Sequence, residues 1–254
     1  MQKKIENILI TGASSGIGEA LAYMYASRGA KKLFLSGRNE ERLQSVGQKC
    51  RTQGAEVECK IIDVADRKAM EKWLQECNQK APLNLVIANA GVSTGEETPD
   101  NIYSTFNTNV MGVINTVTPA VEIYKQINEN KTKIIAITAS IAGYHGLSAC
   151  PSYSASKACV KAYGEALRNS LHLNGIQVNV ICPGFVRSRI TDKNTCPMPF
   201  FMEAPKAAEI IYDGINKNVG LIAFPWPMRF GVWLLSILPN CLSDYIYSRL
   251  PHKV

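Results

Sequence analysis

The sequence lacks a hydrophobic run long enough to cross a membrane. Its 254 residues are 46% hydrophobic, yet no stretch reaches the ~20 consecutive apolar residues that a spanning helix needs. Residues 1–7 are polar and lead directly into a short apolar segment, which is not the pattern of a secretory signal peptide. We therefore expect a cytoplasmic protein. The length favours one domain over residues 1–254, with a core at 5–224 and a tail at 225–254.

Metal-binding and disulfide patterns are lacking as well. The eight cysteines are scattered along the chain, without a C-x-x-C pair and without a cluster of cysteine and histidine. Zinc sites and disulfide frameworks both depend on such spacing. The sequence therefore predicts reduced thiols and no bound metal.

Clustered positive charge is absent, although the net charge is +7. The basic residues form no stripe interleaved with aromatic side chains, so we expect no nucleic-acid partner. A dispersed basic excess suits a polyphosphate cofactor or an anionic membrane surface instead.

The regular feature of the chain is an alternation of short apolar segments with helical patterns. Seven segments predict strands, at residues 5–11, 32–36, 56–62, 83–88, 133–138, 177–182 and 220–224. Helical patterns lie between them, at residues 18–28, 40–53, 67–79, 102–126, 153–173 and 204–216. This alternation predicts an α/β fold: a doubly wound, seven-stranded parallel sheet of the Rossmann type with helices on both faces.

A glycine-rich turn follows the first predicted strand and leads into the first predicted helix. It runs from Thr11 to Gly18. In this setting, backbone N–H groups and the positive end of the helix dipole face an anion. Gly12 would permit the tight turn, Gly16 the approach of a pyrophosphate, and Gly18 the close packing of helix on strand. The turn therefore predicts a dinucleotide phosphate site.

The same turn also fits the G-x-S-x-G nucleophile elbow of serine hydrolases, with Ser14 as the nucleophile. A hydrolase needs an acid and a histidine later in the chain. The three histidines are His145, His172 and His252, and none has a convincing setting. The elbow also normally follows several strands rather than the first. A serine hydrolase stays an alternative.

Tyr153 and Lys157 are four residues apart on a predicted helix, so they share one helix face. A phenol usually titrates near ~10, and a cation within ~4–6 Å lowers a neighbouring pKa by ~1–3 units. The pair therefore predicts a tyrosine tuned for general acid/base catalysis. A plain surface pair is the alternative that the spacing leaves open.

The motifs together resemble the short-chain dehydrogenase/reductase family, in its short form with a hydrophobic C-terminal extension. They occur in the order and at the spacing of that family: Thr11, Gly12, Gly16 and Gly18; Asn89, Ala90 and Gly91; Asn109; Ser140; Tyr153 and Lys157; Pro183 and Gly184.

This resemblance implies a set of four catalytic residues. Tyr153 would exchange a proton with the substrate oxygen, and Lys157 would lower the tyrosine pKa and bind the nicotinamide ribose. Ser140 would donate a hydrogen bond to the carbonyl oxygen as negative charge develops there. Asn109 would hold a water that links Lys157 to solvent.

The resemblance also implies cofactor contacts at the strand ends. They are Gly12, Ser14, Ser15, Gly16, Ile17, Gly18, Arg38, Asp63, Val64, Asn89, Ala90, Gly91, Tyr153, Lys157, Pro183, Gly184, Val186 and Ser188. Ser188 stands where the family usually has threonine, so it keeps the hydroxyl and loses the methyl group.

The end of the second predicted strand favours NADP over NAD. Dinucleotide folds that bind NAD place an acidic residue there, to hold the ribose 2′-hydroxyl. This chain has Gly37 at that position and Arg38 after it. A guanidinium binds a 2′-phosphate with charge-assisted hydrogen bonds. Glu40 and Glu41 lie nearby and weaken this argument.

The tail carries apolar residues at helical spacing. Residues 228–238 predict a helix whose apolar members are Phe230, Trp233, Leu234, Ile237 and Leu238, and a second set follows at Leu242, Tyr245 and Ile246. At ~1.5 Å per residue this helix is too short to span a bilayer. A lid on the substrate pocket, a membrane-surface contact, a subunit interface in a homo-oligomer and packing onto the domain itself all stay open.

These observations favour an NADP(H)-dependent oxidoreductase that acts on an apolar alcohol or carbonyl compound. The apolar character follows from Met198, Phe200, Phe201 and Met202, in the loop after the sixth predicted strand. Tyr144 and His145 are either substrate contacts or ordinary loop residues. The alternatives are an NADP-binding sensor without turnover and the serine hydrolase.

Overall fold

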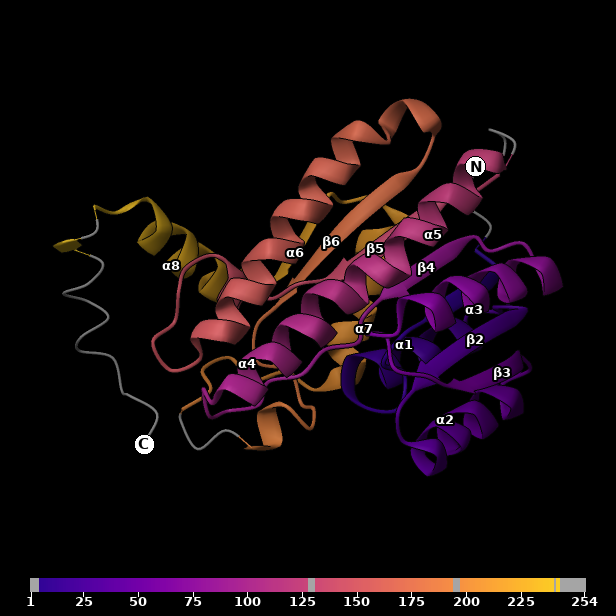
Figure 1. The fold of residues 1–254 in the computed structure, drawn as a ribbon, viewed down its shortest axis with the longest axis horizontal. Coiled ribbons are helices and arrows are strands. Elements are labelled where there is room, and N and C mark those ends of the chain that lie inside the picture. The colour runs from indigo at the N-terminus through magenta and orange to yellow at the C-terminus, as the bar shows by residue number, and fades with distance from the viewer. Residues whose placement is uncertain (1–4, 128–130, 194–196, 240, 243–254) are drawn as a thin grey trace.

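The computed structural model describes residues 5–127, 131–193, 197–239, 241 and 242. Its centre is one seven-stranded parallel sheet in the order β3-β2-β1-β4-β5-β6-β7 (Figure 1). The strands are β1 (Asn7–Ile10), β2 (Lys32–Gly37), β3 (Glu56–Ile61), β4 (Leu85–Ala88), β5 (Ile134–Thr138), β6 (Gln177–Pro183) and β7 (Leu221–Phe224). The predicted fold class is confirmed.

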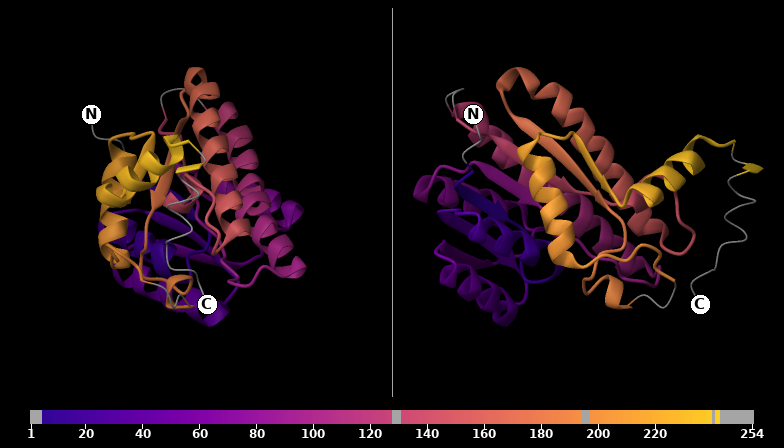
Figure 2. Two further views of the ribbon diagram at one scale, coloured as in Figure 1. Left: turned by 90° about the vertical axis from the view of Figure 1, so that its left-hand side faces the viewer. Right: turned by 180° about the vertical axis from the view of Figure 1, so that it is seen from behind.

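Helices cover both faces of this sheet. The first face carries α1 (Gly16–Ser27), α2 (Glu40–Thr52) and α7 (Ala204–Asn216). The second face carries α3 (Arg67–Lys80), α5 (Gly112–Gln126) and α6 (Pro151–Ser170). Figure 2 shows α7 on one side of the sheet and α5 and α6 on the other. Each face has its own apolar core, because neighbouring residues of a strand point to opposite sides.

Side-chain caps explain where several helices begin. Asn39 accepts a hydrogen bond from the Arg42 N–H at the start of α2, at 3.0 Å. Asp66 does the same for Ala69 at the start of α3, at 3.0 Å. Such caps satisfy amide groups that have no partner within the helix. They fix the first turns of α2 and α3, which follow β2 and β3 after short loops.

The helix predicted at residues 102–126 is divided in the structure. It consists of α4 (Pro99–Phe106), one π-helical turn η1 (Asn107–Met111), and α5. A π turn inserts an extra residue and often marks a functional site. Here it carries Asn109, whose side chain bonds to a loop outside the helix instead of following the helical surface. Apolar periodicity alone cannot reveal such an insertion.

The tail forms helix α8 (Trp226–Ile237), which begins two residues earlier than predicted. It has no buried residue, and it projects beyond β7 beside the lower end of α6 (Figure 1). Its exposed apolar side chains are Trp226, Phe230, Trp233, Leu234 and Ile237. Leu242 is also exposed, whereas Tyr245 and Ile246 lie outside the described residues. Within the described parts of the chain, no helix is long and apolar enough to span a membrane.

The two-faced core makes a first prediction. Leu9 lies on β1, an interior strand of the sheet, and is fully buried. Leu9→Ala should lower the free energy of unfolding by about 2–5 kcal/mol, because the cavity left in the sheet cannot collapse. Urea unfolding followed by circular dichroism measures the change. Leu173→Ala is the matched control, since Leu173 is 92% exposed. Equal effects of the two substitutions would contradict this description of the core.

Candidate active site

A cavity of about 650 Å³ lies at the carboxyl ends of the strands. This is where ligands bind in open parallel sheets, beside the point at which the strand order reverses. The loops after β1 to β6 all contribute to its lining. Eighteen of the residues that the sequence proposed as catalytic or cofactor-binding line it, and only Gly18 and Asn109 do not.

The glycine turn after β1 forms the floor of this cavity and has no room for side chains. Gly12 and Gly16 have φ angles of +66° and +61°, a region that favours glycine. A Cβ atom on Gly12 would lie 2.7 Å from the Ala90 Cα, and one on Gly16 would lie 2.9 Å from the Ser188 Cβ. A Cβ on Gly18 would lie 2.6 Å from the Asn89 Nδ2. The turn therefore presents bare backbone to the cavity, as a phosphate cradle requires.

Asn89 connects this turn to the two strands beside it. Its Nδ2 donates to the carbonyl oxygens of Thr11 and Gly12, at 3.2 and 3.3 Å. Its Oδ1 accepts from the Thr138 hydroxyl at the end of β5, at 3.3 Å. The Thr11 hydroxyl in turn accepts from the N–H groups of Asn89 and Ala90. The sequence reasoning missed Thr138, because the contact joins segments 49 positions apart.

Tyr153 and Lys157 lie in the first two turns of α6 and both line the cavity. The Lys157 Nζ is 5.7 Å from the centroid of the Tyr153 ring. It donates a hydrogen bond to the Thr138 carbonyl oxygen, at 3.0 Å. The pair is therefore not an ordinary surface pair, since Lys157 is only 3% exposed.

The electrostatics of this pair differ from the sequence-based expectation. Burial raises the pKa of Tyr153 to about 12, and a hydrogen bond with Ser140 lowers it only in part. Burial lowers the pKa of Lys157 from 10.5 to about 8. The expected lowering of the tyrosine pKa by Lys157 is not found: loss of water around the phenol dominates, and the one lowering contribution comes from Ser140. Near neutral pH the phenol keeps its proton and most of the lysine stays charged.

Ser140 follows β5 and lies close to the tyrosine. Its Oγ accepts a hydrogen bond from the Ala142 N–H at 3.1 Å and donates weakly to the Pro183 carbonyl oxygen at 3.4 Å. It is 8% exposed. The backbone contact fixes its side chain at the rim of the cavity, where its hydroxyl faces the tyrosine.

Asn109 lies behind the cavity and is fully buried. Its Oδ1 accepts from the Val92 N–H at 2.8 Å, and its Nδ2 donates to the Val92 carbonyl oxygen at 2.9 Å and to the Ser156 hydroxyl at 3.0 Å. A Cβ on Gly91 would lie 3.3 Å from both the Asn109 Oδ1 and the Lys157 Nζ. Asn109 therefore approaches Lys157 across Gly91 and also holds the loop after β4. The expected water link to solvent stays a prediction.

One end of the cavity carries two arginines, of which the sequence reasoning named only Arg38. Arg42, in the first turn of α2, also lines this end. Its Nε is buried and has no hydrogen-bond partner, which is costly unless a ligand supplies one. Asp63 and Val64 line the same end. The sequence did carry a signal for Arg42, because it lies four residues after Arg38, at the start of the helix predicted at residues 40–53.

The other end is formed by the loop after β6. Pro183, Gly184, Val186 and Ser188 all line the cavity there. The sequence reasoning missed Thr191, whose Oγ1 accepts from the Ser188 N–H at 2.9 Å. The Thr191 hydroxyl therefore lies beside Ser188, the residue that stands where the family usually has threonine.

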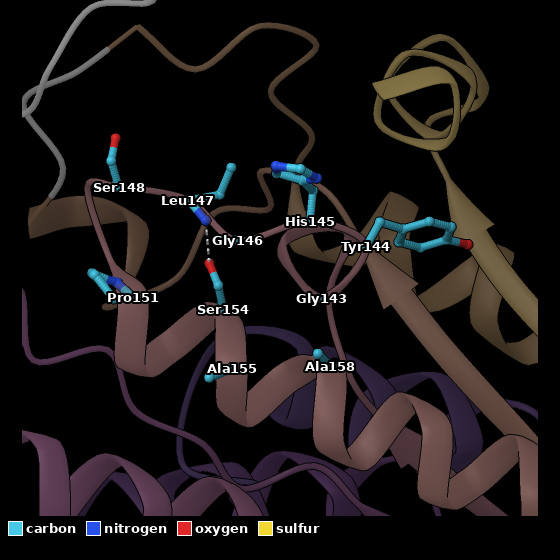
Figure 3. A pocket seen from close by; sticks show the side chains of 10 residues that line it. All are labelled: Gly143, Tyr144, His145, Gly146, Leu147, Ser148, Pro151, Ser154, Ala155 and Ala158. Carbon is cyan, nitrogen blue, oxygen red and sulfur yellow. Dashed lines mark hydrogen bonds between the residues drawn. The ribbon is translucent and has the colours of Figure 1, made fainter. Parts of the chain in front are cut away.

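Tyr144 and His145 do not line this cavity. They line a separate pocket of about 540 Å³, together with Ala155 and Ala158 of α6 (Figure 3). By helix geometry, Ala155 and Ala158 point away from the face that carries Tyr153. Tyr144 and His145 therefore do not lie beside the catalytic tyrosine in the same cavity, and a contact with substrate stays a prediction. No histidine lines the cavity that holds Ser14, which removes the geometric basis for the hydrolase reading among the described residues.

Metal chemistry has no support in the described parts of the chain, where no three His, Cys, Asp or Glu residues cluster as ligands. Cys50, Cys59, Cys77, Cys150, Cys159, Cys182 and Cys241 are free thiols.

Comparison with known proteins gives the family. A model of the short chain dehydrogenase family matches residues 6–197. An uncharacterized oxidoreductase of Myxococcus xanthus is 35% identical over 247 residues, which cover 95% of this chain and 96% of the relative. The 11-beta-hydroxysteroid dehydrogenase-like protein 4A of Arabidopsis thaliana is 32% identical over 249 residues, which cover 92% and 81%.

Solved structures agree on the fold. A short chain dehydrogenase/reductase from Burkholderia phymatum, in complex with NAD, gives a TM-score of 0.82 at 25% identity and covers 100% of this chain and 99% of its own. A short-chain dehydrogenase from Sphingobium yanoikuyae, in complex with NADPH, gives 0.80 at 24% identity and covers 97% and 96%. With the family model matching most of the sequence and relatives aligning over nearly all of it, the chain belongs to the short-chain dehydrogenase family and is an oxidoreductase.

Proposed function

We propose that this protein is an NADP(H)-dependent oxidoreductase that interconverts an apolar carbonyl compound and its alcohol. The observation that carries the proposal is one cavity lined by a half-buried tyrosine, a buried lysine and a buried serine at one side and by two arginines at the other. The first group suits proton transfer to an oxygen atom. The second suits a phosphate.

The chemistry at the tyrosine follows from its protonation state. The glycine turn and the two arginines would hold NADPH, which in the direction of reduction would supply the hydride for the carbonyl carbon. Tyr153 donates the proton that the resulting alkoxide needs, and its raised pKa keeps that proton available at neutral pH. Ser140 stabilises the negative charge on the oxygen by a hydrogen bond. The charge on Lys157 then stabilises the phenolate left behind.

Preference for NADP is supported by the end of β2. A Cβ on Gly37 would lie 3.1 Å from both the Cβ and the Oγ of Ser14, so an acidic side chain there would be crowded. Arg38 and the unpaired Nε of Arg42 line the cavity instead, where they would bind an anion. A 2′-phosphate would satisfy the buried Nε of Arg42, whereas a 2′-hydroxyl would leave the guanidinium without a charged partner.

An apolar substrate is supported by the loop after β6. Met198 and Phe201 line a pocket of about 410 Å³, together with the charged residues Arg187 and Asp192 and with Thr191, which also lines the cofactor cavity. The two spaces therefore adjoin at Thr191. The steroid dehydrogenase-like relative agrees with this substrate class.

Helix α8 provides a further apolar wall near the same end. A Cβ on Gly184 would lie 3.1 Å from the Met228 Sδ, so the first turn of α8 packs against the loop after β6. The remaining apolar face of α8 is exposed. We propose that this helix acts as a lid: it forms one wall of the substrate pocket and contacts long apolar substrates.

The cofactor proposal predicts a selective loss of affinity. Arg38→Ala and Arg42→Ala should each weaken NADPH binding by about 1.5–3 kcal/mol, the value of a hydrogen bond to a charged group. NADH binding should barely change. Fluorescence titration of both cofactors measures this, with Arg67→Ala, an exposed arginine outside the cavity, as the control. Parallel weakening of NADPH and NADH would refute the assignment.

The acid/base proposal predicts a loss of turnover without a loss of cofactor. Tyr153→Phe removes the proton donor and keeps the ring, so kcat should fall at least ~10²-fold while NADPH affinity persists. The assay is NADPH absorbance with a panel of aldehydes and ketones. Tyr163→Phe, on the same helix, is the matched control. Near-normal turnover of Tyr153→Phe would rule out this mechanism.

The lid proposal predicts a substrate-dependent effect of truncation. A chain ending at Phe224 should fold and bind NADPH, yet lose activity on long apolar carbonyl compounds more than on short ones, because it lacks the wall beside Gly184. A chain ending at Leu238 keeps α8 and serves as the control. If the shorter chain unfolds, α8 belongs to the core and the lid role is wrong.

A further inference from the structure

The catalytic helix α6 is capped by a residue from a different loop. Cys150 occupies its N-cap position and makes no side-chain cap hydrogen bond. Glu97, from the loop between β4 and α4, takes this role. Its two carboxylate oxygens lie 3.1 and 3.3 Å from the Ser152 N–H, and the Ser152 hydroxyl donates to Oε1 at 2.8 Å. A carboxylate at this end also interacts favourably with the helix dipole.

The loop that carries Glu97 is itself part of the cavity. Val92, Ser93 and Thr94 line it. Asn109 holds the start of the loop through both backbone groups of Val92. Glu97 ties its end to α6. Hydrogen bonds therefore attach the loop at its start to the buried Asn109 and at its end to the catalytic helix.

The residue that Glu97 holds directly precedes Tyr153. Ser152 is buried and its backbone N–H and hydroxyl both bond to the same carboxylate. A shift of this first turn would move the phenol relative to Ser140 and to the cavity. Displacements of about 1 Å at a reacting group can cost as much as ~10²-fold in rate.

We propose that Glu97 is a positioning residue for Tyr153: it fixes the first turn of α6 and so sets the place of the phenol in the active site. The proposal rests on the proposed function, in which Tyr153 is the proton donor. It assigns a rate effect to a carboxylate that does not line the cofactor cavity.

A plain helix cap would behave differently from a positioning residue. Loss of a cap that matters only for stability lowers the melting temperature and leaves the kcat of the folded protein unchanged. Loss of a positioning contact lowers kcat, while the NADPH dissociation constant stays near its original value, because the glycine turn and the two arginines are untouched.

The test compares three variants. Glu97→Ala removes both acceptors, Glu97→Gln keeps one oxygen acceptor, and Glu96→Ala removes the neighbouring exposed carboxylate of the same loop. We expect kcat to fall about tenfold in Glu97→Ala, in line with the loss of a helix cap and its consequence for geometry. Glu97→Gln should restore part of the rate. Glu96→Ala and the NADPH affinity of all three variants should match the unchanged protein.

A second measurement needs no substrate. Hydrogen exchange of the free protein should quicken at the amides of residues 152–156 in Glu97→Ala and not in Glu96→Ala, because the first turn of α6 loosens. An unchanged exchange rate there would overturn the proposal, as would a kcat equal to that of Glu96→Ala. Absence of any turnover in the unchanged protein, together with faster exchange in Glu97→Ala, would instead count against the proposed function and leave the anchoring of α6 established.

Discussion

The close contact between the glycine turn after β1 and the start of the loop after β4 is the constraint on which the site depends. Gly12 lies so near Ala90 that no side chain fits between them. Asn89 closes this contact through hydrogen bonds to the turn and to β5. The glycine turn keeps the shape that a phosphate site needs only while these hydrogen bonds hold. They also fix the end of β5, which carries the Thr138 carbonyl oxygen and leads into Ser140.

From this point the cavity extends in two directions with different chemistry. Towards β2 its lining carries the positive charges of Arg38 and Arg42. Towards β5 and β6 it ends at the tyrosine and lysine of α6, where burial keeps a proton on the phenol and makes the lysine easier to deprotonate.

Much of the fold and many of the site residues could be predicted from the sequence because their signals are local. The alternation of strands and helices and the glycine spacing are all read within a few neighbouring residues. The pairing of Tyr153 with Lys157 follows equally from one turn of helix. Three expectations were less successful. The π turn at Asn109 divided a predicted helix, Tyr144 and His145 face a different pocket, and the tyrosine pKa is raised rather than lowered.

By itself, therefore, the sequence determined the seven-stranded parallel fold and which residue types stand at the ends of its strands. The tertiary structure alone decided how they act on one another. The tyrosine pKa depends on how much water the packed loops exclude, and the unpaired Arg42 nitrogen becomes apparent only once α2 has docked beside the cavity. Glu97 and Ser152 meet although they are 55 positions apart in the chain. Burial and contact between distant segments are properties of the assembled fold, and no local pattern of residues encodes them.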